Sequence, residues 1–126
     1  MPAKTSATLT EAELRLMEVL WAKGPSTVQQ VVDALPADTP LAYNSVLTTI
    51  RILEKKGYVG HDKDGRAHVF KPIVARQQAA RSEVRNLVRR MFRNSHELLV
   101  LNVLEEEQID LPELKRLREM LNKEGQ

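Results

Sequence analysis

The clearest alternation of hydrophobic and polar positions along this chain lies between residues 41 and 57. Val46, Ile50 and Leu53 recur at spacings of four and three, which predicts the buried face of a helix. Gly57 follows two lysines and predicts where that helix ends, because glycine and cations both suit a helix C-terminus. The opposite face carries amide, hydroxyl and cationic side chains at helical spacing: Asn44, Thr48, Arg51 and Lys55.

Two shorter patterns predict helices ahead of this one. Thr10 and Glu13 fit a capping box, so a first helix should begin there and run to about residue 23. Ser26 and Gln29 fit a second capping box, which predicts a short helix that ends before Pro36. Three helices are therefore expected within the first 57 residues.

A β-hairpin is predicted directly after these helices. Residues 58–61 and 66–70 are short segments with β-branched and aromatic side chains, and they flank an Asp-Gly turn signal at residues 62–65. The order of three helices and a hairpin is typical of the winged helix, in which the hairpin lies on the DNA backbone or in the minor groove. Lys63 and Arg66 are the predicted wing contacts, the alternative being ordinary surface charges.

The remaining residues predict further helices. Residues 73–93 form a basic segment with an apolar face, and Ser95 and Asp110 fit the caps of two short helices rich in leucine. Such short helices cannot bury their apolar faces alone, so we expect them to pack against a second copy of the chain. The leucines expected in this contact are Leu98, Leu101, Leu104, Leu114, Leu117 and Leu121.

These elements predict a mainly α-helical protein with a small β-hairpin. We expect a winged helix-turn-helix DNA-binding domain over residues 1–72, and a helical linker and dimerisation region over residues 73–126. A symmetric dimer of winged helices predicts a palindromic operator in double-stranded DNA, because the two-fold axis of the protein is matched by that of its site.

Composition and charge agree with a DNA-binding protein. The chain has 126 residues, no cysteine and no stretch of the apolar length of a membrane span, so we expect a soluble cytoplasmic protein without disulfides, thiolate metal sites or membrane insertion. Residues 1–93 carry fifteen Lys and Arg against nine Asp and Glu, whereas residues 94–126 carry four against eight. The basic part is the one expected to meet a polyanion.

The polar face of the third helix suits a DNA major groove. Asn44 can pair with an adenine edge through its amide, and the methyl group of Thr48 can meet a thymine methyl. Arg51 and Lys55 are predicted phosphate contacts, which position the protein without reading sequence. A solvated helix face is the alternative for all four.

Two residues at the start of this helix keep two interpretations each. Tyr43 is either a phosphate donor through its hydroxyl or a packing residue. Ser45 lies at the edge of the polar face and is either a base or phosphate contact or a local cap.

Enzymatic and metal chemistry are not indicated. His61 and His68 fall on opposite arms of the predicted hairpin, where their rings can face each other, but two histidines without a third nearby ligand make a poor metal site. No serine, histidine and aspartate are arranged as nucleophile, base and orienting group, and no glycine-rich phosphate loop occurs. We therefore expect no catalytic residues, no metal and no cofactor.

An ordered set of fragments resembles the BlaI/MecI penicillinase-repressor family, a family of winged-helix dimers with copper-responsive relatives. The resemblance covers nearly the whole chain, from residue 9 to residue 123. The fragments that carry it are LTEAE (9–13), VLW (19–21), TV (27–28), LAYNSVLTT (41–49), KGYV (56–59), GRA (65–67), LVLNVLEE (99–106) and LNK (121–123).

The resemblance implies a transcriptional repressor that binds palindromic operators with TACA/TGTA half-sites through helix 42–56 and the wing. It implies dimerisation through the C-terminal helices, and derepression when a membrane sensor-metalloprotease, or proteolysis that it triggers, leads to cleavage there. The cleaved bond in that family follows an asparagine that matches Asn102, which makes Asn102–Val103 the candidate bond. The best-known members have phenylalanine where this chain has Val103.

Two alternatives to a protease-controlled repressor follow from the same residues. The copper-responsive mechanism uses Cys-x-Cys motifs, which this chain lacks. A winged helix can also serve as a protein-interaction module, but such a surface is expected to expose aromatic or aliphatic anchors rather than amides and cations. A small-molecule inducer would need an apolar pocket between the wing domain and the dimer helices.

Overall fold

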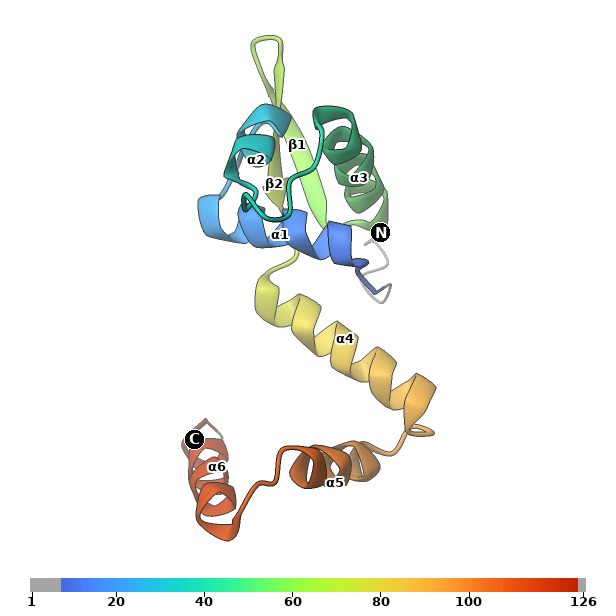
Figure 1. Cartoon of the computed structure of the whole chain (residues 1–126), viewed down its shortest axis with the longest axis vertical. Helices are drawn as coiled ribbons and strands as arrows, with labels where there is room; N and C mark the ends of the chain where they lie inside the picture. Colours follow the sequence, from blue (N-terminus) through green and yellow to red (C-terminus); the bar gives the residue numbers. More distant parts are fainter. Residues whose placement is uncertain (1–7, 125–126) are drawn as a thin grey trace. The chain divides into compact units, whose positions relative to one another are not determined.

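Six helices and a two-stranded antiparallel sheet make up residues 8–124, the part of the chain that this computed structural model describes (Figure 1). The described chain divides within α4 into two compact units, residues 8–86 and 87–124. The elements are α1 (Glu11–Lys23), α2 (Val28–Ala34), α3 (Tyr43–Lys56), β1 (Val59–Asp64), β2 (Ala67–Pro72), α4 (Arg76–Met91), α5 (His96–Glu106) and α6 (Leu111–Glu124).

The core of the first unit lies where α1, α2 and α3 meet the hairpin. The three hydrophobic positions predicted for α3 are all fully buried, and α1 contributes side chains buried to the same degree. The amphipathic interpretation of α3 is therefore confirmed. Its ends are α3 Ala42, which caps without a side-chain hydrogen bond, and Gly57, which adopts φ 88° and ψ 14°, a left-handed conformation that glycine adopts without steric cost.

Capping boxes start α1 and α2, but the second one is not where the sequence pattern placed it. At α1, Glu13 N–H donates to Thr10 Oγ1 at 3.2 Å and Thr10 N–H donates to Glu13 Oε1 at 2.8 Å, as predicted. At α2 the capping residues are Thr27 and Gln30, with distances of 3.1 and 2.9 Å.

The predicted cap at Ser26 is wrong because Ser26 belongs to the sheet side of the fold. Its N–H and carbonyl both pair with the backbone of Phe70 at 2.8 Å, in an isolated antiparallel bridge to β2. The serine is fully buried, and its hydroxyl donates to the Gly24 carbonyl at 2.9 Å. A residue held in this extended pairing leaves the capping position to its neighbour Thr27.

The hairpin is longer and its turn is tighter than the sequence pattern suggested. Strand pairing runs from Val59 opposite Pro72 to Asp64 opposite Ala67, so the tip consists of two residues, Gly65 and Arg66. The predicted turn at residues 62–65 is wrong. Its first three residues continue β1, and Gly65 provides the positive φ, 65°, that a two-residue hairpin loop needs.

The beginning of α4 is attached to α1. Trp21 Nε1–H donates to the Val74 carbonyl at 2.9 Å. Arg76, the first residue of α4, pairs with Glu18 through both guanidinium nitrogens and lies over the Trp21 ring, 4.8 Å from its centroid. These contacts fix how the basic helix leaves the first unit.

The second unit contains α5 and α6, which begin at the predicted caps. Leu98 N–H donates to Ser95 Oγ at 3.2 Å, and Glu113 N–H donates to Asp110 Oδ1 at 3.0 Å. No residue of α5 or α6 is buried within the described chain. None of the helices between residues 8 and 124 has the length and apolar character needed to cross a membrane.

Candidate nucleic-acid interface

The polar face of α3 is open to solvent along its whole length. All four of its predicted contact residues are exposed, and Ser45 lies exposed beside them. Tyr43, at the first position of the helix, keeps 46% of its surface exposed, so it is not a core residue. Lys63 and Arg66 are exposed on the hairpin. The fold thus leaves every predicted DNA-contact residue accessible to a partner.

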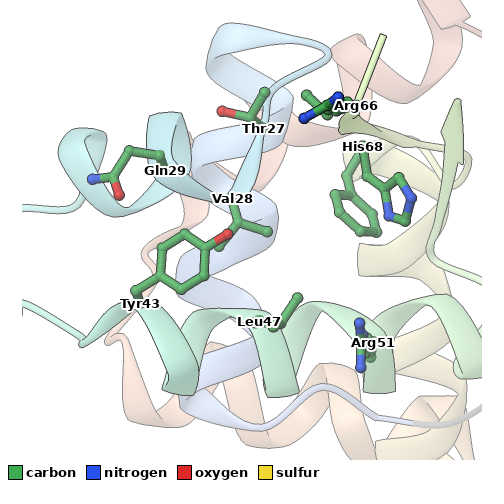
Figure 2. A pocket seen from close by; sticks show the side chains of 10 residues that line it. Thr27, Val28, Gln29, Tyr43, Leu47, Arg51, Arg66 and His68 are labelled. Atoms are coloured by element: carbon green, nitrogen blue, oxygen red, sulfur yellow. The ribbon is translucent and has the colours of Figure 1, made fainter. Parts of the chain in front are cut away.

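A hollow of about 430 Å³ lies between α2, α3 and the hairpin (Figure 2). It brings together three of the predicted contact residues, Tyr43, Arg51 and Arg66, from two elements that are separate in sequence. The other predicted residues lie outside it. The residues that line it are Thr27, Val28, Gln29, Tyr43, Leu47, Arg51, Arg66, Ala67, His68 and Phe70.

Sequence reasoning missed three polar residues of this hollow. Thr27 and Gln29 reach it from the start of α2, and His68 reaches it from β2 (Figure 2). The predicted order of elements contained a usable signal, since a helix-turn-helix places the start of one helix beside the exposed face of the next. The misplaced cap of α2 concealed that Thr27 was the first polar residue there.

The chemistry of the hollow suits an anion. Its lining includes two guanidinium groups, an imidazole, two hydroxyls and an amide, and no carboxylate. Arginine forms strong charge-assisted hydrogen bonds to phosphate oxygens, and hydroxyl and amide groups are common phosphate donors at protein–DNA interfaces. The sugar–phosphate backbone of a nucleic acid matches this set of donors.

The two histidines of the hairpin do face each other. The rings of His61 and His68 stack with centroids 4.9 Å apart, and His61 Nδ1 lies 2.5 Å from Glu54 Oε2 on α3. Since a carboxylate only accepts, this ring nitrogen carries the proton. Among residues 8–124, no three His, Asp or Glu side chains are grouped so that they could hold a metal ion.

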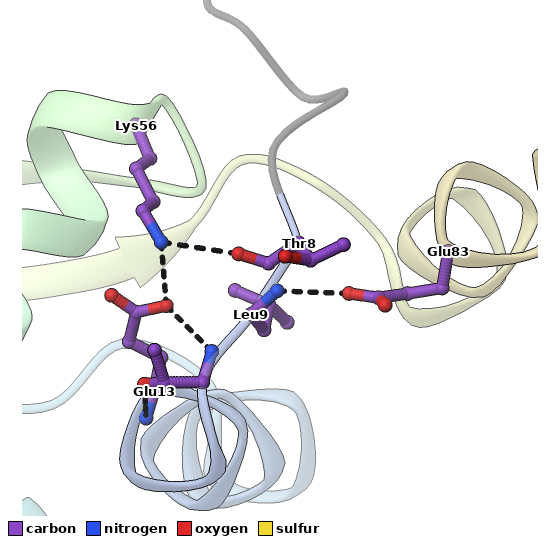
Figure 3. Close-up of polar contacts among 6 residues, drawn as sticks. Thr8, Leu9, Glu13, Lys56 and Glu83 are labelled. Atoms are coloured by element: carbon purple, nitrogen blue, oxygen red, sulfur yellow. Dashed lines mark hydrogen bonds and ion pairs between the residues drawn. The ribbon is translucent and has the colours of Figure 1, made fainter. Parts of the chain in front are cut away.

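A buried ion pair holds the C-terminal end of α3 (Figure 3). Lys56 Nζ donates to Glu13 Oε1 at 2.7 Å and to the Thr8 carbonyl at 3.1 Å. Next to it, Leu9 N–H donates to Glu83 Oε2 on α4 at 2.9 Å. Burial raises the pKa of Glu13, but the hydrogen bonds from Lys56 and Thr10 outweigh burial, and the net pKa is lowered.

Replacement of Glu13 by glutamine is expected to make stability less dependent on acid. Because the folded-state pKa of Glu13 lies below its ordinary value of 4.5, the carboxylate stabilises the fold above that pH, and this contribution is lost as pH falls through the folded-state value. We expect Glu13→Gln to cost about 1–3 kcal/mol at pH 7, measured by urea unfolding.

The same measurement at pH 3 provides the contrast. The difference between the wild type and Glu13→Gln should shrink toward zero there, because both side chains are then neutral. Glu11→Gln, an exposed change in the same first turn, is the matched control and should have little effect at either pH. A difference that stays constant from pH 7 to pH 3 would contradict the role of the Glu13 charge.

Comparison with known families identifies the chain. The sequence profile described as "Penicillinase repressor" matches residues 9–123. The chain belongs to the penicillinase repressor family. This family consists of DNA-binding transcriptional repressors and not of enzymes, so the resemblance to the BlaI/MecI proteins is confirmed.

Individual members of the penicillinase repressor family are similar over most of the chain. The methicillin resistance regulatory protein MecI of Staphylococcus aureus strain N315 is 24% identical over 115 residues, which is 91% of this chain and 94% of MecI. The penicillinase repressor of Bacillus licheniformis is 26% identical over 113 residues, covering 90% and 88%. The transcriptional regulator BlaI of Mycobacterium tuberculosis H37Rv is 39% identical over 71 residues, 56% of this chain and 51% of BlaI.

A solved structure from the penicillinase repressor family supports the fold assignment. The solution structure of the DNA-binding domain of the repressor BlaI matches with a TM-score of 0.53 and 26% sequence identity. The match covers 62% of this chain and 93% of that domain. The predicted winged-helix fold is therefore confirmed.

Proposed function

We propose that this penicillinase-repressor homologue represses transcription by binding a palindromic operator as a homodimer. The observation that carries the proposal is the exposed polar face of α3 beside a hollow that contains cations and no carboxylate. α3 lies in the major groove, and the hairpin lies on the flanking backbone. Because a repressor acts on chromosomal DNA, we place it in the cytoplasm.

The side chains divide into two groups by the chemistry they offer. Asn44, Ser45 and Thr48 read base edges with half-sites of the TACA/TGTA type, because amide and hydroxyl groups can pair with base edges and a methyl can contact thymine. Phosphate contacts come from the longer and more basic side chains and from the hollow. They are Tyr43, Arg51, Lys55, Lys63 and Arg66, joined by Thr27, Gln29 and His68.

Dimerisation through α5 and α6 is supported by apolar surface that a single chain leaves open. Leu101 is 55% exposed and Leu121 is 73% exposed. Exposed leucines repeated along two helices are unfavourable in water, and burial against a second copy removes them from it. The proposed dimer contact includes Leu98, Leu101, Leu104, Leu114, Leu117 and Leu121.

Release from the operator is proposed to follow cleavage between Asn102 and Val103, through a membrane sensor-metalloprotease or proteolysis that it triggers. Both residues are exposed, which makes the bond reachable in a single chain. They lie inside α5, and proteases cut extended backbone, so cleavage requires local unwinding of this helix. A cut there separates Leu98 and Leu101 from the leucines that follow.

Operator binding is tested by fluorescence-anisotropy titration. A TACA/TGTA palindrome and a shuffled duplex are compared at one salt concentration near physiological strength, because affinities depend steeply on salt. We expect a preference of about a hundredfold, or about 2.7 kcal/mol, for the palindrome. Equal, weak binding to both duplexes would contradict this operator and direct the search to other sequences or to a protein partner.

Two variants separate base reading from backbone contact. Thr48→Ala should cost about 1–3 kcal/mol on the palindrome and relax the preference over the shuffled duplex. Arg66→Ala should weaken both duplexes alike and reduce the slope of log affinity against log salt by about 1, because one phosphate contact is lost. Identical effects of the two changes on preference and slope would contradict the assigned roles.

A further inference from the structure

A carboxylate stands beside the proposed DNA-binding surface. Glu54 is the acidic residue of α3, and its neighbours on the helix include Arg51 and Lys55. A negative charge so close to a phosphate backbone repels it and weakens binding. Some contact made by Glu54 has to offset this repulsion if the residue serves the interface.

The contact that the structure offers runs from α3 to the hairpin. Glu54 Oε2 accepts the Nδ1 proton of His61 at 2.5 Å. Both side chains are partly exposed, with 34% and 36% of their surface accessible, so water reaches the pair but does not separate it. Glu54 lies in the last turn of α3 and His61 lies in β1, so the bond joins the recognition helix to the first strand of the wing.

His61 passes this connection to the second strand. Its ring stacks on His68 of β2 and lies 5.5 Å from the ring of Phe70, which is buried. Phe70 is itself held by backbone pairing with Ser26. His68 lines the hollow together with Arg51 and Arg66. The pair therefore connects α3 with both strands at the place where the cationic hollow opens.

We propose that Glu54 and His61 are positioning residues that hold the wing at a set distance from α3. With the hairpin held there, Arg66 reaches the backbone while Thr48 reaches the bases, so both contacts form in one encounter. The inference rests on the proposed DNA-binding function. The advantage is preorganisation, because a wing that is already placed loses less conformational freedom on binding.

The sign of the effect of Glu54→Ala tests the proposal. If Glu54 only repels phosphate, its removal strengthens binding. If it positions the wing, removal lowers operator affinity, by about five- to tenfold for the loss of one charged hydrogen bond. Glu54→Gln keeps an oxygen that accepts from His61 and should restore most of the affinity. Unchanged or tighter binding by Glu54→Ala overturns the proposal.

The opposite face of the same hairpin supplies a matched control. Asp62 accepts from Lys71 Nζ at 2.9 Å, in an exposed ion pair that stays within the hairpin. Asp62→Ala removes one negative charge from the wing without touching α3, and it should leave operator affinity unchanged or slightly raised. A loss equal to that of Glu54→Ala would assign both effects to hairpin stability and overturn the positioning role.

Coupling to Arg66 gives a readout that a merely structural role does not move. In the Glu54→Ala background the wing is no longer held, so Arg66→Ala should cost a smaller factor in operator affinity than it does in the wild type. Equal factors in the two backgrounds, with unchanged melting temperatures, would overturn the proposal.

Measurements without DNA keep this inference distinct from the proposed function. ¹⁵N relaxation of the hairpin amides in the free protein should show greater mobility in Glu54→Ala than in Asp62→Ala. If the wild type shows no operator preference, the proposed function fails, while these amides still decide whether Glu54 holds the wing. Equal mobility in the two variants overturns positioning whether or not DNA binds.

Discussion

Glutamate in place of Leu101 on α5 and Leu117 on α6 is expected to convert the proposed dimer into monomers and to lower operator affinity by about 10²–10⁴-fold. The two leucines are 55% and 41% exposed in the single chain, so the charges cost little in the monomer. In a dimer they would be buried without partners, which is strongly unfavourable. A monomer then binds each half-site separately and loses the effective concentration that links the second half-site to the first.

Sedimentation velocity measures the oligomeric state, and anisotropy on the palindrome measures the affinity. Arg116→Glu, on the exposed polar side of α6, is the matched control because it introduces the same side chain outside the leucine positions. It should remain dimeric and keep its affinity. A Leu101→Glu, Leu117→Glu variant that sediments like the wild type would place the dimer contact elsewhere, and one that is monomeric with full affinity would contradict two-fold binding.

The second large effect is expected beneath the recognition surface. Ile50 is completely buried in α3, directly between the residues that carry Thr48 and Arg51 to the exposed face. Ile50→Ala removes apolar contacts and leaves a cavity that a packed core fills only in part. We expect a loss of about 2–5 kcal/mol in the free energy of unfolding, a large share of the 5–15 kcal/mol typical of small domains.

Urea unfolding followed by circular dichroism measures this loss. Ile52→Ala is the matched control, since Ile52 lies two residues further along the same helix and is 42% exposed. It should cost far less, because little apolar surface returns to water there. Similar losses for the two variants would mean that the core does not depend on the α3 face that its hydrophobic spacing defines.

The sequence determined those features whose cause is local. Helical spacing in α3 predicted which residues are buried, because the period of an α-helix alone decides which side chains share a face. The caps at Thr10, Ser95 and Asp110 were predictable for the same reason, since each involves an N–H only three residues away. The ordered fragments along the chain were enough to indicate the penicillinase repressor family.

Only the tertiary structure decided the features that depend on residues far apart in sequence. The cap of α2 moved to Thr27 because Ser26 pairs with Phe70, forty-four residues later, and a capping pattern contains no information about that partner. Strand register placed the hairpin tip at Gly65 and Arg66, since pairing continued through polar residues that read as a turn.

The hollow and the bond between Glu54 and His61 likewise needed the fold. The hollow takes its donors from α2, α3 and β2, three segments that the sequence separates by loops and a strand. Each of its side chains reads as an ordinary surface residue when taken alone. Local periodicity specifies which face of an element is buried, whereas packing between elements decides which exposed side chains meet, and the chemistry of the proposed interface arises from those meetings.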